Sequence, residues 1–312
     1  MKDPENPPLW SVMIPAYNPR REHLEQALRS VLAEDSEPQR MQIEVVDDCS
    51  PNVDVAALVK EIAGERVAYS RNEANLGLAG SWNRCGERSK GVWVHILHQD
   101  DYVLPGFYER LEAAAAAHPE VSLLTARCVL VDERGASRGE TERLAGLESG
   151  GREVSEYLYR NPFRCPGVVV RRAFYESHGG FRTDLSFTLD WELWIRAIAL
   201  EGGVALPAVL AAYRSSDENA SARLAEDADT LQDRMRLNAI FAERYPKFDR
   251  KKAERYVCLE ALSEADRFAR LGQKRAAAAH LEYFRSYAPI RLRVREWVAR
   301  AVRKLVSIGH AR

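Results

Sequence analysis

Two pairs of adjacent aspartates stand directly after short apolar segments of the sequence. Asp47 and Asp48 end the run QIEVVDD, and Asp100 and Asp101 follow the run VWVHILHQ. Neighbouring carboxylates repel one another unless a bound cation or a ligand rich in hydrogen-bond donors relieves the repulsion. Because carboxylate oxygens are the ligands that Mg²⁺ and Mn²⁺ take, these residues are candidates for binding a divalent cation and an anionic ligand.

These aspartates fall within a regular alternation of expected strands and helices. Short apolar strands are expected at residues 10–15, 42–47, 67–70 and 92–97, with apolar residues at helical spacing between them. This alternation predicts a parallel sheet that is covered by helices on both faces. Ligands of such sheets bind at the carboxyl ends of the strands, so the residues after each strand are candidates for one binding site.

The residues that follow these strands suit a nucleotide diphosphate. They are Pro15 and Tyr17, Asp48, Asn75 and Gly77, His98, and the pair Asp100 and Asp101. A carboxylate such as Asp48 accepts hydrogen bonds from a base N–H or a ribose hydroxyl. Gly77 begins an expected helix, where the absence of a side chain lets the backbone approach a ligand closely. A cation on Asp100 and Asp101 would neutralise charge on the diphosphate.

The second half of the chain is expected to extend this sheet and then to become helical. The expected elements are a long strand at 121–135 that turns at Asp132–Gly135, a strand at 165–172, a helix at 190–203, and a strand after Gly203. From residue 222 onward the apolar pattern is helical to the end of the chain. We therefore predict an α/β catalytic domain over residues 1–221 and a helical region over residues 222–312.

Six segments, in this order and with similar spacing, resemble the inverting glycosyltransferases of family 2. They are SVMIPAYN, VVDDCSPN, RNEANLGLAGSWN, VHILHQDDYVLPG, VVVRRAFYESHGGF and DWELWIR, and they cover roughly residues 9–220. The resemblance implies the GT-A fold, with a mostly parallel sheet, and the transfer of a sugar from a nucleotide-diphosphate sugar. It favours a UDP-sugar, since that is the commonest donor in the family, and a glycan or lipid-linked saccharide acceptor in surface polysaccharide synthesis.

The resemblance also implies roles for individual residues. Asp48 matches the residue that contacts the nucleobase, and Pro15, Tyr17, Asn75 and Gly77 match the lining of the same pocket. Asp100 matches the second aspartate of the DXD motif, which binds Mn²⁺ or Mg²⁺, with Asp101 beside it. Asp190, at the start of DWELWIR, matches the base that takes the proton of the acceptor hydroxyl. An aspartate with an ordinary pKa of about 3.9 is ionised at neutral pH and available for this role.

The sequence departs from the family pattern in its metal-binding residues. His98 replaces the first aspartate of DXD, where it could face the ribose, and no histidine follows Tyr213-Arg214. These departures favour a second hypothesis, a catalytically weak subunit that binds nucleotide sugars within a glycan assembly complex. Two structural alternatives also stay open: Asp190 as a helix cap and Asp47 as a turn residue.

Other enzyme classes fit the sequence less well. A nucleotidyltransferase would need a glycine-rich basic loop after the first strand, and PAYNPRR contains no glycine. A dehydrogenase is disfavoured because no GxGxxG follows any expected strand. The QxxRW signature of processive synthases is also missing, which predicts an enzyme that adds a single sugar.

Charge is distributed unevenly over a chain of 312 residues with a net charge of −1. Residues 226–312 carry 20 Lys and Arg against 12 Asp and Glu, whereas residues 1–225 have a net charge of −9. The acidic first part argues against nucleic acid as a partner. Five dispersed cysteines and a polar start of the chain predict a cytoplasmic protein with reduced thiols.

The segment 290–308 has an apolar stripe with Trp297 opposite a mostly basic face. This pattern predicts a helix that lies on an anionic membrane surface, at the inner face of the plasma membrane. A terminal helix packed on its own domain or on a dimer partner would show the same stripe, so both interpretations stay open.

Overall fold

The computed structural model describes residues 7–35, 37–215 and 228–294. Contacts divide the chain into two units, Met1–Ser216 and Asp217–Arg312, and each is described here by itself. The predicted domain boundary between residues 221 and 222 lies outside the described residues. So does most of the predicted membrane-binding segment, from residue 295 onward.

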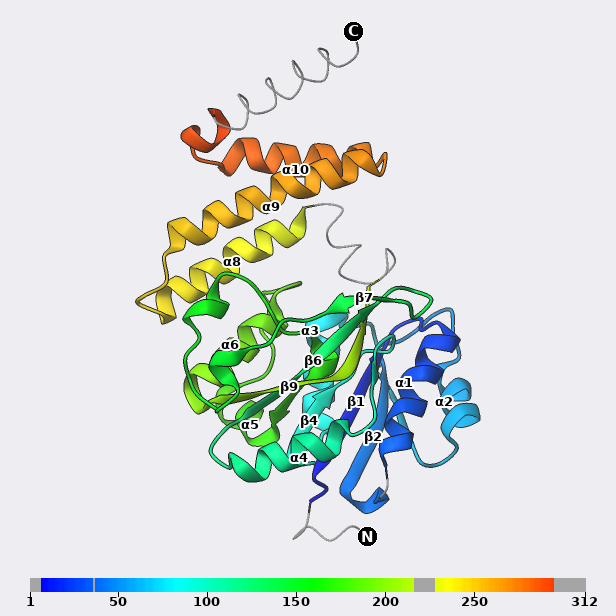
Figure 1. Ribbon diagram of the computed structural model, residues 1–312. Coiled ribbons are helices and arrows are strands. Elements are labelled where there is room, and N and C mark those ends of the chain that lie inside the picture. Colours follow the sequence, from blue (N-terminus) through cyan, green and yellow to red (C-terminus); the bar gives the residue numbers. More distant parts are fainter. Residues whose placement is uncertain (1–6, 36, 216–227, 295–312) are drawn as a thin grey trace. The chain divides into compact units, whose positions relative to one another are not determined.

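The first unit is an α/β fold built on a nine-stranded sheet flanked by helices (Figure 1). The strands run in the order β3-β2-β1-β4-β8-β6-β9-β5, and β7 pairs with β6. Their bounds are β1 (Trp10–Ala16), β2 (Met41–Asp47), β3 (Ala68–Arg71), β4 (Trp93–Ile96), β5 (Tyr102–Val103), β6 (Leu123–Val131), β7 (Ser137–Glu140), β8 (Val168–Arg171) and β9 (Gly203–Arg214). This architecture confirms the predicted α/β fold class.

Strand direction differs between the two halves of the sheet. Strands β3, β2, β1 and β4 are all parallel, as the alternation of strands and helices predicted. Beyond β4 the sheet is mixed, because β8 is antiparallel to both β4 and β6, whereas β9 is parallel to β6. The carboxyl ends of β1, β2 and β4 therefore lie at one edge of the sheet.

The helices of the first unit account for most of the expected pattern. Their bounds are α1 (Arg21–Glu34), α2 (Val55–Ala63), α3 (Gly77–Arg88), α4 (Phe107–Ala117), α5 (Arg172–His178) and α6 (Leu189–Glu201). Helix α4 was not expected from the sequence, because its run of alanines shows little periodicity while Phe107, Tyr108 and Leu111 supply its buried contacts. The short turns are 3₁₀ helices at Pro38–Arg40, Ala145–Leu147, Ser155–Leu158 and Cys165–Gly167.

The strand expected at residues 165–172 begins at Val168, because Cys165–Gly167 form a 3₁₀ helix. Gly167 is required there by close packing, since a Cβ at this position would lie 2.5 Å from the carbonyl oxygen of Ala126 in β6. Strand β6 ends at Val131, directly before the turn that the sequence predicted at Asp132–Gly135, where the backbone N–H of Gly135 donates to the carbonyl oxygen of Asp132 at 2.9 Å.

The second unit is helical, in agreement with the predicted pattern. It contains α8 (Asp229–Arg244), α9 (Arg250–Arg270) and α10 (Lys274–Tyr287). The Asp249 carboxylate caps α9 by accepting a hydrogen bond of 2.9 Å from the backbone N–H of Lys252. The core contains Leu231, Val257, Ala261 and Phe284. Within the described part of the chain, no helix combines the length and apolarity needed to cross a bilayer.

Candidate functional site

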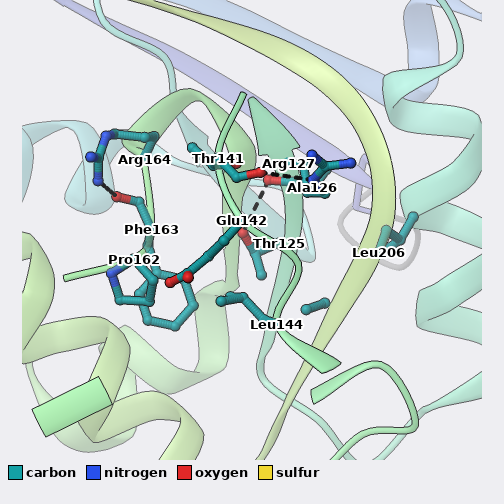
Figure 2. Close-up of a pocket in the computed structure, with 11 residues that line it drawn as sticks. Thr125, Ala126, Arg127, Thr141, Glu142, Leu144, Pro162, Phe163, Arg164 and Leu206 are labelled. Carbon is teal, nitrogen blue, oxygen red and sulfur yellow. Dashed lines mark hydrogen bonds between the residues drawn. The ribbon is translucent and has the colours of Figure 1, made fainter. Parts of the chain in front are cut away.

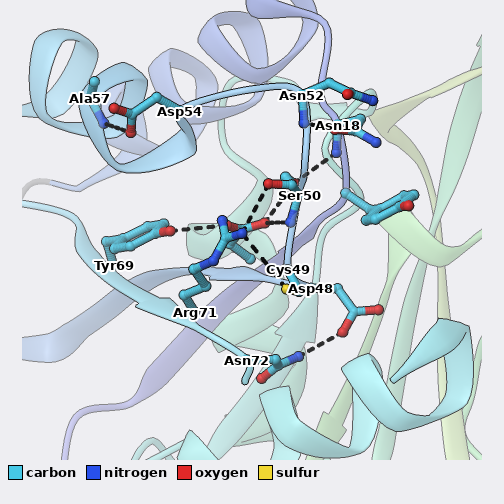
Figure 3. Close-up of polar contacts among 12 residues, drawn as sticks. Asn18, Asp48, Cys49, Ser50, Asn52, Asp54, Ala57, Tyr69, Arg71 and Asn72 are labelled. Atoms are coloured by element: carbon cyan, nitrogen blue, oxygen red, sulfur yellow. Dashed lines mark hydrogen bonds and ion pairs between the residues drawn. The ribbon is translucent and has the colours of Figure 1, made fainter. Parts of the chain in front are cut away.

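Asp47 and Asp48 are adjacent at the end of β2, but their surroundings differ. Asp47 is fully buried, and its carboxylate accepts hydrogen bonds from the backbone N–H and the hydroxyl of Ser50 at 2.9 and 2.6 Å. The same carboxylate accepts from the Tyr69 hydroxyl at 2.9 Å and from Arg71 at 2.5 Å (Figure 3). Asp47 therefore holds the turn after β2, which is the structural role that the sequence left open for it.

The Asp48 carboxylate is hydrogen-bonded to the segment between β3 and α3. Its Oδ1 accepts hydrogen bonds from Nδ2 of Asn72 at 2.8 Å (Figure 3) and from the backbone N–H of Leu76 at 2.9 Å. Both of these bonds use one oxygen, so Oδ2 is the acceptor that remains for the N–H or hydroxyl of a ligand.

The segment that contacts Asp48 also contains Asn75 and Gly77, and both are exposed. Oδ1 of Asn75 accepts a hydrogen bond of 2.9 Å from the backbone N–H of Gly77, which begins α3. Gly77 has φ of +69°, and no atom lies within 4 Å of the position that a Cβ would occupy. Backbone conformation therefore favours glycine here, and the start of α3 stays open for a ligand.

Pro15 and Tyr17 lie at the end of β1, beside the residues that follow β4. The Tyr17 ring is 43% exposed, whereas its backbone is held by Gln99. The backbone N–H of Tyr17 donates to Oε1 of Gln99 at 2.8 Å, and its carbonyl accepts from Nε2 at 3.3 Å. Gln99 thus joins the ends of β1 and β4, a positioning role that the sequence analysis did not assign. Its place inside HQDD was the signal available.

His98, Asp100 and Asp101 form a cluster whose candidate ligand atoms all lie within 4.8 Å of one another. The Asp101 side chain is 1% exposed, and Oδ1 accepts a hydrogen bond of 2.7 Å from the backbone N–H of Arg214. Its Oδ2 lies 3.3 Å from Nδ1 of His98. Oδ2 of Asp101 and Nε2 of His98 are both buried without a hydrogen-bond partner. Buried oxygen and nitrogen atoms without a hydrogen-bond partner are suited to bind a cation.

The electrostatics of the cluster are set by its burial and by the charges of its own three residues and of Cys165. Burial and the charge of Asp101 together raise the pKa of Asp100 to about 6, against an opposing effect of His98. Burial lowers the pKa of His98, but Cys165 and Asp101 raise it, and the net direction is well above the ordinary value. A divalent cation would offset the repulsion between the two carboxylates.

Asp190 lies in the first turn of α6 and is partly exposed. Thr188 is the N-cap residue of α6. Asp190 therefore does not have the N-cap role that the sequence analysis left open for it. Its Oδ1 accepts a hydrogen bond of 2.5 Å from the backbone N–H of Trp191. Burial raises the pKa of Asp190 to about 6, and this N–H, His98 and Arg164 oppose the rise. The charge of His98 acts on Asp190, so α6 brings Asp190 into the surroundings of the cluster.

Arg214, the last residue of β9, connects the cluster to the rest of the first unit. It is buried, and besides its backbone bond to Asp101 its Nε donates to the carbonyl oxygen of Asp100 at 3.0 Å. The remaining guanidinium contacts are Oε1 of Gln26 and the carbonyl oxygens of Asp132 and Glu133. The sequence analysis mentioned Arg214 only because no histidine follows it. The role of Arg214 could not be predicted, because its partners are far away along the chain.

The turn at residues 178–181 leads into α6 and is held from two sides. The Asn83 side chain exchanges hydrogen bonds with the backbone of Phe181 at 2.9 and 2.7 Å. Arg196 forms a buried ion pair with Glu192 at 3.0 Å and donates to the carbonyl oxygen of Gly180 at 2.8 Å. Both sets of contacts hold the turn that precedes Asp190 in the chain. The other large side chains of this helix, Trp191 and Trp194, are buried in the core.

A small cavity of about 10 Å³, with room for about one water molecule, lies beside Arg164 in the first unit (Figure 2). Its lining includes Thr125, Arg127, Thr141, Glu142, Leu144, Pro162, Phe163 and Arg164. The Phe163 ring contacts the Trp194 ring of α6 at a centroid distance of 5.8 Å. Arg164 lines this cavity, and its charge also acts on the candidate base Asp190.

Solved structures share this fold at low sequence identity. Residues 1–349 of TarS from S. aureus, in complex with UDP-GlcNAc, are 18% identical with a TM-score of 0.59, over 80% of this chain and 70% of that chain. The mannosyltransferase PcManGT from Pyrobaculum calidifontis, in complex with GDP-Man and Mn²⁺, is 19% identical with a TM-score of 0.59, over 96% of this chain and 81% of that chain. These similarities support the GT-A-like fold.

Two sequence relatives are more similar to the chain. The amylovoran biosynthesis glycosyltransferase AmsE of Erwinia amylovora is 30% identical over 219 residues, which are 69% of this chain and 79% of AmsE. An uncharacterized protein of Mycobacterium tuberculosis is 29% identical over 242 residues, which are 74% of each chain. The family described as glycosyl transferase family 2 matches residues 11–177, more than half of the chain. The chain therefore belongs to glycosyl transferase family 2 and is a glycosyltransferase.

Proposed function

We propose that this protein transfers one sugar from a nucleotide-diphosphate sugar to a hydroxyl of a glycan or lipid-linked acceptor, with inversion at the anomeric carbon. The observation that carries the proposal is the arrangement of three acidic sites in the first unit. Asp48 follows β2 and the cluster around Asp100 follows β4, which both run parallel to β1, and the charge of His98 in the cluster acts on Asp190. Donor binding, cation binding and proton removal each require one of them.

The nucleotide would bind at the ends of β1 to β3. Oδ2 of Asp48 would accept a hydrogen bond from the base or ribose, and the exposed ring of Tyr17 offers an apolar face for stacking. Pro15, Asn75 and Gly77 would complete the lining. A UDP-sugar is the proposed donor, and the UDP-GlcNAc that TarS binds supports this choice.

His98, Asp100 and Asp101 would hold a divalent cation, Mn²⁺ or Mg²⁺, against the diphosphate of the donor. Their orphaned buried atoms and their mixed carboxylate and imidazole donors fit such an ion. When bound, the cation supplies positive charge that stabilises the departing nucleotide diphosphate. The Mn²⁺ in the mannosyltransferase PcManGT supports this assignment.

Asp190 would act as the general base. A pKa of about 6 leaves its carboxylate ionised at neutral pH, yet makes it more basic than an ordinary aspartate. It would take the proton of the acceptor hydroxyl while that oxygen attacks the anomeric carbon from the face opposite the diphosphate. The new glycosidic bond forms as the bond from the anomeric carbon to the diphosphate breaks.

The acceptor would lie on the Arg164 side of Asp190, where Phe163 and the polar side chains of Figure 2 are candidates to contact a saccharide. The role of AmsE in amylovoran biosynthesis supports a surface polysaccharide as the product. A lipid-linked acceptor would place the enzyme at the cytoplasmic face of the membrane. Its five free thiols support a reducing location, and the basic segment 290–308 would bind anionic lipid there.

The test is a panel of nucleotide sugars incubated with the purified protein and Mn²⁺, with release of the nucleotide diphosphate as readout. We expect turnover of at least one donor, and loss of that turnover in Asp190→Asn with UDP affinity retained. The second candidate function, a partner subunit without catalysis, is favoured by His98 and by the residues after Arg214. Binding of UDP without turnover of any donor would support that candidate instead.

A further inference from the structure

The cluster at the end of β4 contains a nitrogen donor in addition to carboxylate oxygens. His98 stands with Asp100 and Asp101 in the one group of such residues, within the described chain, whose candidate ligand atoms lie within 4.8 Å of one another. A site built from oxygen alone suits Mg²⁺, which dehydrates reluctantly. An imidazole suits transition metals, whose affinity for nitrogen-containing sites rises from Mn²⁺ through Co²⁺ and Ni²⁺. The presence of the His98 nitrogen beside carboxylate oxygens therefore affects which ion this site prefers.

The imidazole of His98 is held in place before any ion binds. Its ring packs on the Trp82 ring of α3, with 4.9 Å between centroids and 33° between the planes. Its Nδ1 lies 3.3 Å from Oδ2 of Asp101, whose side chain is 99% buried. Both that Oδ2 and Nε2 of His98 lack a hydrogen-bond partner. An imidazole held in this way needs little reorganisation, beyond the loss of a proton, to become a ligand.

We propose that His98 is a nitrogen ligand of the divalent cation, and that the site prefers transition metal ions such as Mn²⁺ and Co²⁺ to Mg²⁺. The inference rests on the proposed function only in that a cation binds this cluster. It makes His98 a determinant of metal selectivity, where an aspartate at the same position would give an all-oxygen site. If His98 instead contacted only the ribose of the donor, it would have no effect on the binding of metal ions alone.

The first experiment measures the binding of Mg²⁺, Mn²⁺ and Co²⁺ alone by calorimetry, without nucleotide. We expect the wild-type protein to bind Co²⁺ at least about tenfold more tightly than Mg²⁺. His98→Asp should reduce this ratio about tenfold by weakening Co²⁺ binding and strengthening Mg²⁺ binding. The matched control is His23→Gln on α1, because the charge of His23 acts on Asp100 although His23 lies outside the cluster. An unchanged ratio in His98→Asp would overturn the proposal.

The second experiment takes its main result from the wild-type protein, so it stands even if His98→Asp fails to fold. Electron spin-echo spectroscopy of Mn²⁺ bound to the wild-type protein should show coupling to one imidazole ¹⁴N. The coupling should persist in His23→Gln and disappear in His98→Asp. Absence of the coupling in the wild type, or its loss in His23→Gln, would overturn the assignment.

The two proposals fail in different ways. Donor turnover that is equally fast with Mg²⁺ and Mn²⁺, together with equal affinity for the two ions, would overturn the metal preference and leave the transferase function standing. Nitrogen coupling and transition-metal preference without turnover of any donor would support the role of His98 and contradict the transferase function.

Discussion

Replacing Asp190 by Asn should abolish sugar transfer and at the same time stabilise the first unit at pH 8. The reason is that the ionised carboxylate is costly in its buried surroundings. Burial raises the pKa of Asp190 from 3.8 to about 6. At about 1.4 kcal/mol for each pH unit, this rise corresponds to roughly 3 kcal/mol, and partial exposure to solvent reduces the expected gain to about 2 kcal/mol.

The sign of the pH dependence follows from proton binding. The folded protein binds the Asp190 proton more tightly than the unfolded chain, so this carboxyl group stabilises the fold below about pH 4 and that stability is lost as pH rises through 6. Asn has no charge to desolvate, so its advantage over wild type should be largest at pH 8. At pH 5 it should be about half as large, because the wild-type carboxyl group is then mostly protonated in the folded state.

The assay combines thermal unfolding with donor turnover. For a unit of this size, 2 kcal/mol corresponds to a rise in Tm of roughly 4–8 °C at pH 8, and loss of the base should lower turnover about 10²–10⁴-fold. The matched control is Asp54→Asn, because Asp54 is the N-cap of α2 and Asn caps a helix equally well. This control should leave both Tm and turnover nearly unchanged. Lower stability of Asp190→Asn at pH 8, or near wild-type turnover, would refute the reasoning.

Three further predictions concern the adjacent carboxylates and the end of the chain. Asp100→Ala should remove the metal-dependent part of UDP binding, whereas Asp48→Ala should weaken UDP binding equally with Mn²⁺ and with EDTA; calorimetry giving the same metal dependence for both variants contradicts these roles. Asp47→Ala should lower the free energy of unfolding, measured by urea denaturation, by about 3 kcal/mol, because it leaves the buried partners of that carboxylate unpaired. A smaller loss of stability than in Asp48→Ala would argue against the structural role of Asp47. Truncation after Pro289 should abolish sedimentation with anionic liposomes at low salt while UDP binding persists; unfolding of the truncated protein would assign the segment to the core.

The sequence alone was sufficient to predict the α/β class and the edge of the sheet where the candidate site lies. Strands β1, β2 and β4 are each a short apolar run followed by polar residues, and this pattern is local. It could not predict the antiparallel strand β8 between β4 and β6, because pairing between strands far apart in the sequence leaves no local pattern. Helix α4 was missed for a related reason, since its alanines are compatible with many environments.

The tertiary structure gives the physical reason why Asp47 and Asp48, to which the sequence analysis gave different roles, are not equivalent. Asp47 and Asp48 are identical neighbours in the sequence, yet one carboxylate is saturated by Ser50, Tyr69 and Arg71 while the other keeps an oxygen for a ligand. Burial and charge also set the pKa of Asp190, and both come from residues that are distant along the chain. Side-chain types and spacing identify groups capable of chemistry. Their protonation states and their unused hydrogen-bond acceptors depend on neighbours that only folding brings together.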